Sequence, residues 1–285
     1  MSWLVTLIIA LLAPALAPDE AGGGGEPRRG VTIPLDRAGD GAPLPAVTPA
    51  RGTSPPLVVI DPGHGGRAPG AGSPVDDARE KDVTLALARS IRDALARSGR
   101  VRVALTRDDD RYLLLEERYA IARRLGADLF ISIHADAAPR NDQAAGATVY
   151  TLSEVASDRE AALLARRENE ADRIAGARLS PDPNINLILI DLAQRESMDV
   201  SAEFARLLYR EASPVFPFRP DWHRFAAFVV LKAPDIPSIL FESGYLTNET
   251  DAAYIQSDEG RGQIAEGMRR AIEAHFARRF VREAG

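Results

Sequence analysis

The stretch Leu57-Val58-Val59-Ile60-Asp61-Pro62-Gly63-His64-Gly65-Gly66 joins four apolar residues to a rigid, glycine-rich turn that carries a histidine. The same pattern, an apolar β-type run that ends near a polar side chain, returns at Phe130–Asp136 with His134 and at Ser238–Gly244 with Glu242. In an open parallel sheet, the carboxyl ends of the strands line the ligand crevice. We therefore expect these polar side chains, which are far apart in the sequence, to converge on one site.

Apolar runs alternate with amphipathic helices from residue 57 onward. Apolar side chains recur at four-residue steps from Val83 to Leu95, as in an amphipathic helix, and Gly99 is a typical cap at its end. The pattern predicts strands at 57–60, 101–106, 128–134, 147–152, 228–231 and 238–241, and helices at 82–98, 115–125, 158–177, around 200–208 and 260–280. This order predicts an α/β fold, a single domain over 57–285 whose central, mostly parallel twisted sheet of about six strands has helices on both faces.

Residues 153–216 interrupt the alternation. They hold a charged helix, a break at Pro181-Asp182-Pro183 and a second amphipathic helix, without a strand pattern. We interpret this segment as a helical insertion between two strands of the sheet.

The N-terminal residues differ in composition from the rest. Residues 2–17 are uncharged and apolar and end on Ala15-Leu16-Ala17, a small-x-small pattern that predicts a secretory signal over 1–17. The alternative is a retained membrane anchor, although the stretch is short for a bilayer span. Residues 18–56 are rich in Gly, Pro, Ala and Arg without apolar periodicity, and they predict a flexible tether. A secreted protein without a stable membrane span after signal cleavage is expected.

The amino-acid composition limits the partners and the metal ligands that this chain can have. The net charge of -6 gives no sign of affinity for nucleic acid, so we expect no nucleic-acid partner. Cysteine is absent, which excludes disulfides and thiolate metal ligands. Any metal must therefore be held by carboxylates and by some of the four histidines.

Three side chains match a known kind of metal site when they are taken together. His64 and His134 lie near two strand ends, and Glu80 opens a predicted helix. Each has a structural alternative: a surface turn for His64, a structural histidine for His134, and a favourable helix-dipole position for Glu80. Two histidines and one carboxylate are the ligands of hydrolytic zinc sites that keep a fourth position for water, although the same donors hold other divalent ions.

Glu242 is the candidate catalytic carboxylate. It ends an apolar strand, where a buried carboxylate is costly unless it is paired or used. Beside a metal-bound water it could accept the proton of the water and pass it to a leaving amine. The structural alternative is a glutamate that backbone donors or an arginine satisfy.

Five segments in order resemble the zinc-dependent N-acetylmuramoyl-L-alanine amidases of bacterial cell-wall remodelling, over residues 57 to about 280. The segments are 59–66, 80–83, 105–108, 132–136, and 231–238 with 242–248. The resemblance implies His64, Glu80 and His134 as ligands of one Zn²⁺ and Glu242 as the catalytic carboxylate. It also implies a peptidoglycan substrate, which is hydrolysed at the amide between the lactyl group of N-acetylmuramic acid and the L-alanine of the stem peptide.

The insertion also resembles a known region. Residues 167–172 and 189–192 are similar to the regulatory helical region of the periplasmic cell-division amidases. In that group a glutamate fills the open position of the zinc until an activator displaces it. The resemblance implies Glu168 in this role, or Glu170 as a weaker match, and an activator protein that docks on apolar side chains around Leu187–Leu192. The alternative is a solvated helix with Glu and Arg pairs.

Two further side chains, Arg107 and Asp136, are candidates for orienting the metal ligands from behind. Two other functions stay open: a catalytically silent peptidoglycan-binding or adaptor module with the same fold, and a zinc peptidase or deacetylase. Free stem peptide with an intact glycan would indicate the amidase, and released acetate would indicate the deacetylase. The resemblance further implies a periplasmic protein of daughter-cell separation.

Overall fold

The structure is a computed structural model of the chain, and it describes residues 43–74, 76–138, 141, 143–174 and 187–284. The predicted secretory signal over 1–17, the first part of the predicted tether and the break at Pro181-Asp182-Pro183 lie outside the described residues.

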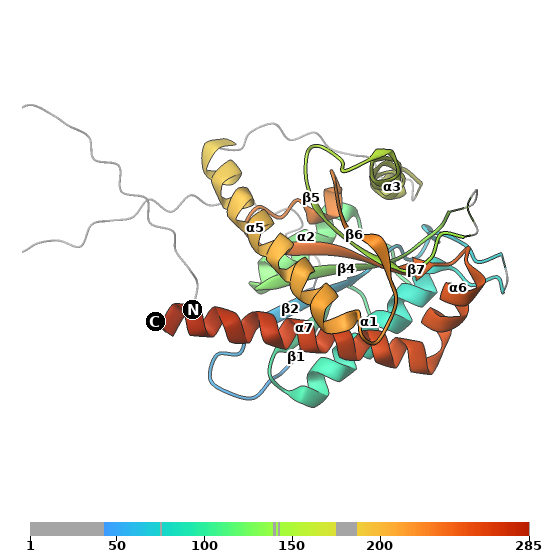
Figure 1. The fold of residues 1–285 in the computed structure, drawn as a ribbon. Coiled ribbons are helices and arrows are strands. Elements are labelled where there is room, and N and C mark those ends of the chain that lie inside the picture. The colour runs from blue at the N-terminus through green and yellow to red at the C-terminus, as the bar shows by residue number, and fades with distance from the viewer. Residues whose placement is uncertain (1–42, 75, 139–140, 142, 175–186, 285) are drawn as a thin grey trace, which may run out of the picture. The chain divides into compact units, whose positions relative to one another are not determined.

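A seven-stranded sheet with the order β1-β3-β2-β4-β7-β5-β6 forms the centre of the fold (Figure 1). The strands are β1 Val47–Thr48, β2 Leu57–Pro62, β3 Arg102–Leu105, β4 Leu129–Asp136, β5 Ala147–Leu152, β6 Phe218–Ala226 and β7 Ser238–Tyr245. Strands β3, β2, β4 and β7 pair in parallel, as do β5 and β6, while β1 is antiparallel to β3 and β5 is antiparallel to β7. The predicted α/β class with a mostly parallel sheet is confirmed, with one strand more than the six expected.

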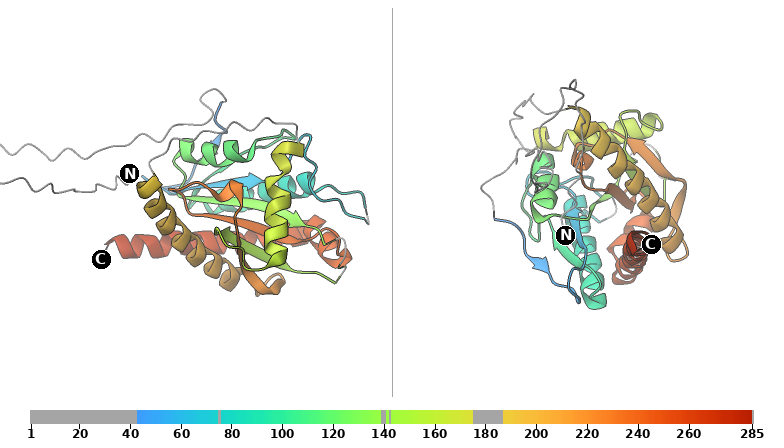
Figure 2. Two further views of the ribbon diagram at one scale, coloured as in Figure 1. Left: turned by 90° about the horizontal axis from the view of Figure 1, so that it is seen from above. Right: turned by 90° about the vertical axis from the view of Figure 1, so that its left-hand side faces the viewer.

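Helices cover both faces of this sheet (Figure 2). They are α1 Glu80–Ser98, α2 Leu115–Leu125, α3 Arg159–Asn169, α4 Ala171–Ile174, α5 Leu187–Ala212, α6 Glu249–Gln256 and α7 Asp258–Ala284, with a 3-10 helix η1 Val229–Leu231. Helices α1, α5 and α7 pack on one face, and α2, α3 and η1 pack on the other. None of the described helices combines the length and the apolar character that crossing a membrane requires.

Strand β2 shows why the first apolar run becomes a central strand. Val58 and Ile60 face the layer of α1 and α7, and Leu57 and Val59 face the opposite layer. A parallel strand that is buried on both faces has an almost continuous apolar sequence, which is what residues 57–60 provide.

The prediction of a strand at 228–231 is wrong, because Val229–Leu231 forms the 3-10 helix η1. Short apolar runs do not distinguish a strand from other buried segments, since periodicity needs a longer window. The strand in this part of the chain is β6, which the sequence did not reveal. It contains Pro220 and three charged residues and lies at the edge of the sheet, where proline is tolerated and one side is open to water.

The tether predicted over 18–56 does not extend to residue 56. Val47 and Thr48 form β1, which pairs with Ala104 and Val103 of β3. A two-residue edge strand is too short to show an alternating pattern, so the composition of the segment concealed it. The helix predicted over 158–177 is also divided, since α3 ends at Asn169 and α4 begins at Ala171.

A buried ion pair lies beneath the end of β2. Arg118 of α2 contacts Asp61 at 3.0 Å, and both side chains are almost fully buried. Ser132 donates a second hydrogen bond to Asp61 over 2.9 Å. Arg118 also donates to the carbonyls of Pro62 and His64, over 2.9 and 2.7 Å. The pair therefore joins α2 to the turn that carries His64.

Replacing Arg118 by methionine should lower the free energy of unfolding by about 3–5 kcal/mol, because Asp61 would remain as a buried charge without its ion-pair partner. The measurement is equilibrium denaturation in urea, with the same metal content for each variant. Arg173→Ala is the control, since Arg173 and Glu170 form an exposed pair whose loss costs about 1 kcal/mol or less. Equal midpoints for the two variants would contradict a stabilising role for the buried pair.

Candidate active site

The turn after β2 places His64 at the carboxyl edge of the sheet. The backbone N–H of Gly63 donates to the carbonyl of Ile133 over 2.9 Å, which ties this turn to β4. His64 itself has a positive φ of 59°. Non-glycine residues rarely adopt this conformation, and it is held where the surroundings determine it, often at functional sites.

Arg107, which follows β3, holds the backbone behind the site. Its guanidinium donates to the carbonyl of Pro62 over 3.0 Å, to that of Gly63 over 2.7 Å and to that of Lys81 over 2.9 Å. Burial and the nearby Arg118 lower the pKa of Arg107 to about 10. Arg107 therefore joins the turn that carries His64 to the first turn of α1, mainly through backbone carbonyls and also through the hydroxyl of Thr84 at 3.4 Å.

Arg118 is the residue of this region that the sequence analysis missed. Its signal is visible in the helix pattern, because Arg118 lies in the same stripe as the buried residues Leu115 and Ala122. A charged residue in an apolar stripe predicts a buried partner, which here is Asp61.

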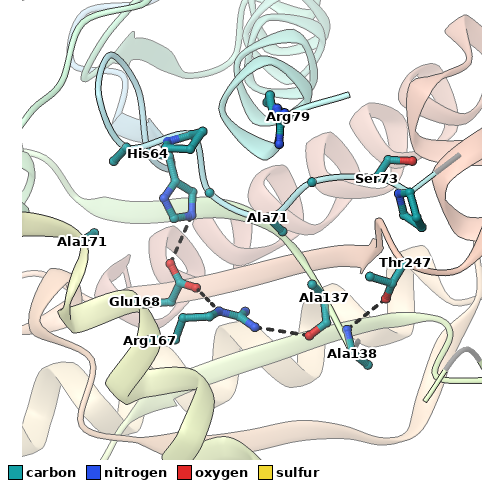
Figure 3. Close-up of a pocket in the computed structure, with 15 residues that line it drawn as sticks. His64, Ala71, Ser73, Arg79, Ala137, Ala138, Arg167, Glu168, Ala171 and Thr247 are labelled. Carbon is teal, nitrogen blue, oxygen red and sulfur yellow. Dashed lines mark hydrogen bonds and ion pairs between the residues drawn. The ribbon is translucent and has the colours of Figure 1, made fainter. Parts of the chain in front are cut away.

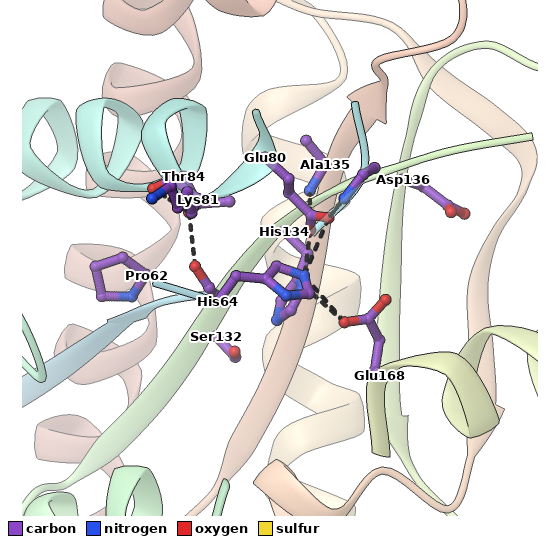
Figure 4. Close-up of polar contacts among 12 residues, drawn as sticks. Pro62, His64, Glu80, Lys81, Thr84, Ser132, His134, Ala135, Asp136 and Glu168 are labelled. Carbon is purple, nitrogen blue, oxygen red and sulfur yellow. Dashed lines mark hydrogen bonds and ion pairs between the residues drawn. The ribbon is translucent and has the colours of Figure 1, made fainter. Parts of the chain in front are cut away.

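Four side chains from four segments converge at this edge (Figure 4). They are His64, Glu80 at the start of α1, His134 of β4 and Glu168 of α3, and one ligand atom of each lies within 4.8 Å of the others. Glu80 Oε2 lies 3.0 Å from Nε2 of His64, and Glu80 Oε1 lies 2.9 Å from Nδ1 of His134. The predicted convergence of His64, Glu80 and His134 is therefore present, and Glu168 joins them.

Backbone donors hold the carboxylate of Glu80 in place. Oε2 accepts from the N–H of Ala71 over 2.7 Å, and Oε1 accepts from the N–H of Ala135 over 3.1 Å. Burial alone would raise the pKa of Glu80, but His64 and His134 lower it well below its usual range. The same carboxylate, together with that of Glu168, outweighs burial and raises the pKa of His64 to about 10.

The geometry of this cluster fits a divalent cation. Atoms that share one zinc ion at 2.0–2.2 Å are about 3–4 Å apart, and the closest contacts of the cluster are 2.9 to 3.4 Å. The buried Nε2 of His64 has two carboxylate oxygens within 3.1 Å but forms a hydrogen bond with neither. Nδ1 of His134, in contrast, forms a hydrogen bond with Oε1 of Glu80 over 2.9 Å. The close approach of imidazole and carboxylate ligand atoms suits one shared ion.

Glu242 lies beside this cluster on β7. It pairs in register with His134 of β4, and neighbouring strands are about 4.8 Å apart. Both carboxylate oxygens are buried without a hydrogen-bond partner among the described residues. Burial, followed by the negative charges of Asp136, Glu80 and Glu168, raises the pKa of Glu242 well above its usual range.

Glu168 enters the cluster from the insertion, and Glu170 does not. Oε2 of Glu168 lies 3.1 Å from Nε2 of His64 and 3.4 Å from Nδ1 of His134. Glu170 is exposed and contacts Arg173 at 3.4 Å. Burial alone would raise the pKa of Glu168, but His64 and His134 lower it to about 2.

Three polar residues fasten the chain around Glu168 to the domain. Arg167 contacts Asp136 at 2.7 Å. It also contacts Glu168 at 3.1 Å and the carbonyl of Ala137 at 3.2 Å (Figure 3). Asn169 donates to the carbonyl of Ala227 and accepts from the N–H of Val229, both over 2.8 Å.

The third residue is Asp172 of α4. It accepts from the hydroxyl of Tyr112 over 2.6 Å and from the N–H of Leu115 over 3.0 Å, at the start of α2. Asp136 was a sequence-based candidate for orienting the metal ligands. In the structure it binds Arg167 and the N–H of Ala137. Its contacts thus connect β4 to the insertion.

A cavity of about 780 Å³ adjoins the cluster (Figure 3). His64 and Glu168 form part of its wall, and the loop before α1, Ala137, Ala138 and Thr247 form much of the rest. The cluster therefore lies at the border of a space that is large enough for part of a peptide or sugar.

The sequence of this chain is similar to those of known proteins. The sequence model of the N-acetylmuramoyl-L-alanine amidase family matches residues 58–274. The N-acetylmuramoyl-L-alanine amidase AmiA of Escherichia coli (strain K12) is 37% identical over 222 residues, which are 77% of this chain and 76% of AmiA. The amidase AmiC of Escherichia coli O6:H1 is 34% identical over 224 residues, which are 78% of this chain and 53% of AmiC, so the chain spans about half the length of that relative.

A solved structure gives the same result for the fold. The N-acetylmuramoyl-L-alanine amidase AmiC2 of Nostoc punctiforme superposes with a TM-score of 0.57 and 28% identity, over 79% of this chain and 99% of that one. The family model covers most of the chain, and the relatives exceed 30% identity over more than three quarters of it. This chain therefore belongs to the N-acetylmuramoyl-L-alanine amidase family.

Proposed function

We propose that this chain is a secreted, periplasmic hydrolase that cleaves the amide between N-acetylmuramic acid and the L-alanine of the stem peptide in peptidoglycan. The observation that carries the proposal is the convergence of His64, Glu80 and His134 next to the unpartnered carboxylate of Glu242. Cell-wall remodelling and daughter-cell separation are the processes in which such a hydrolase would act.

His64, Glu80 and His134 would hold one Zn²⁺. A zinc ion at such a site polarises the scissile carbonyl and lowers the pKa of water to about 7. Glu242 accepts a proton from the attacking water and donates it to the nitrogen of L-alanine as the C–N bond breaks, so that the peptide leaves as a neutral amine. Both carboxylate oxygens of Glu242 are buried without a hydrogen-bond partner among the described residues, which leaves them available to exchange this proton.

Glu168 would keep the site closed. Its carboxylate occupies the space between His64 and His134, where the substrate carbonyl and water have to enter. The contacts of Arg167, Asn169 and Asp172 hold the segment in that position. An activator protein that docks on the helical insertion would open the site by withdrawing α3. The structure describes the backbone at Leu187–Leu192, the expected docking surface, as part of α5 but does not describe its side chains.

A silent peptidoglycan-binding module is the second candidate. The position of Glu168 in the cluster favours this second candidate, because a site that Glu168 never leaves would not hydrolyse a substrate. The variants below separate the two candidates.

Metal content distinguishes the three ligands from the blocking glutamate. The wild type and Glu168→Ala should each hold about one zinc per chain, because His64, Glu80 and His134 complete a three-residue ligand set. His64→Ala should hold far less than one. Elemental analysis after dialysis measures this, and stoichiometric zinc in His64→Ala would contradict the ligand assignment.

Replacing Glu242 by glutamine should reduce hydrolysis by about 100-fold or more, because the amide cannot accept the proton of the attacking water. Zinc content and the folded structure should not change. Release of stem peptide from purified sacculi is the assay, and Glu249→Gln, the same exchange at an exposed position of α6, is the control. Full activity in Glu242→Gln would exclude Glu242 as the proton carrier, and release of acetate would indicate a deacetylase.

Glu168→Ala should raise basal hydrolysis roughly ten-fold or more, which corresponds to about 1.4 kcal/mol of lost blocking interaction. Glu170→Ala is the matched control, because Glu170 is exposed and outside the cluster. The comparison uses the two zinc-loaded proteins on the same sacculi. If both variants hydrolyse at the wild-type rate, Glu168 does not close the site.

A further inference from the structure

The cavity beside the cluster has mostly apolar walls and one arginine that no acidic group neutralises. The apolar walls come from Ala68, Pro69, Ala71, Pro74, Ala137 and Ala138. Two arginines line the cavity, and one of them, Arg167, is paired with Asp136 and Glu168. The other, Arg79, is exposed and has no ion pair or side-chain hydrogen bond with any residue that the structure describes.

We propose that Arg79 is a substrate-binding residue whose guanidinium recognises a free carboxylate of the stem peptide. The inference rests on the proposed amidase function and assigns the cavity to the peptide side of the scissile bond. Guanidinium groups bind carboxylates through two parallel hydrogen bonds, which gives both strength and orientation.

The loop between β2 and α1 fixes how far Arg79 lies from the metal cluster. A Cβ atom on Gly70 would lie 2.5 Å from Oε2 of Glu80, so Gly70 touches the cluster. A Cβ atom on Gly72 would lie 2.9 Å from Nη1 of Arg79, so Gly72 lies directly beneath the guanidinium. Two residues of extended chain span at most about 7 Å.

In an extended stem peptide, a similar distance separates the scissile amide from a carboxylate further along the chain. With the scissile amide at the cluster, a carboxylate one or two residues further along an extended peptide lies at most about 7 Å away. The loop itself is held in shape, because Gly72 and Arg79 form an antiparallel bridge and Ser73 donates to the carbonyl of Ala78 over 2.9 Å. The backbone of Arg79 is therefore held beside the cavity, and its side chain reaches a region within one or two peptide residues of the reacting bond.

The charges of the substrate indicate which of its parts, the glycan or the stem peptide, lies next to Arg79. The lactyl carboxyl of N-acetylmuramic acid is consumed in the amide, so the glycan next to the scissile bond is neutral, whereas the stem peptide carries free carboxylates. Asp136 and Glu80 are already paired, with Arg167 and with two histidines. Arg79 has no such partner among the described residues, so its positive charge is available to a carboxylate of the peptide.

The test compares two synthetic substrates, N-acetylmuramoyl-L-alanyl-D-glutamic acid and its diamide, which differ only in charge. The zinc-loaded full chain and Glu168→Ala are assayed for kcat/KM on both. We expect a preference for the free acid of roughly ten-fold or more. Arg79→Gln should remove the preference through KM, Arg79→Lys should retain part of it, and zinc content should not change.

Two further variants control the measurement. Arg67→Gln removes an exposed arginine of the same loop that does not line the cavity, and it should keep the wild-type preference. Gly72→Ala places a methyl group against the guanidinium and should weaken the preference while Arg79 is still present. Arg79→Gln with the wild-type preference, or a wild type that does not distinguish the substrates, would overturn the proposal.

Failure of the amidase function itself would have a different signature. If neither the wild type nor Glu168→Ala hydrolyses either substrate, calorimetric binding of L-alanyl-D-glutamate to zinc-loaded Glu168→Ala tests recognition directly. Binding that weakens roughly ten-fold in the Arg79→Gln background would support recognition without hydrolysis. Equal binding with and without Arg79 would overturn it.

Discussion

The parallel pairing of β2, β4 and β7 is the constraint on which the site depends. Because parallel strands end at the same edge of a sheet, the turn after β2, His134 and Glu242 meet there although the chain between them is long. The register places His134 directly beside Glu242. A shift by one residue would turn the side chains of a strand to the opposite face and would separate these two groups.

The carboxylates buried at this edge differ in how their charge is compensated. Asp61 is satisfied by Arg118 and by hydroxyl donors, so it acts as part of the framework. Glu80 is satisfied by two histidines and by backbone N–H groups. Glu242 has no partner for either oxygen among the described residues. An unsatisfied buried carboxylate is costly, and such groups persist where chemistry requires them.

Much of the fold followed from local patterns, and the exceptions have physical causes. The central strands were predictable because burial on both faces demands continuous apolar runs such as residues 57–60. The edge strands β1 and β6 were not, since an edge is half open to water and tolerates Pro220 and charged residues. The run at Val229–Leu231 is as apolar as a strand but packs as a 3-10 helix over the sheet.

The sequence by itself determined the α/β class, the family and the candidate residues His64, Glu80, His134 and Glu242, because each stands in a local motif at a predicted strand end or helix start. Only the tertiary structure decided that Glu168, and not Glu170, enters the cluster, since residues two apart on a helix point in roughly opposite directions. Only the tertiary structure brought Arg79 to the wall of the cavity. Both depend on how separate elements dock, which is set by contacts between residues distant in sequence.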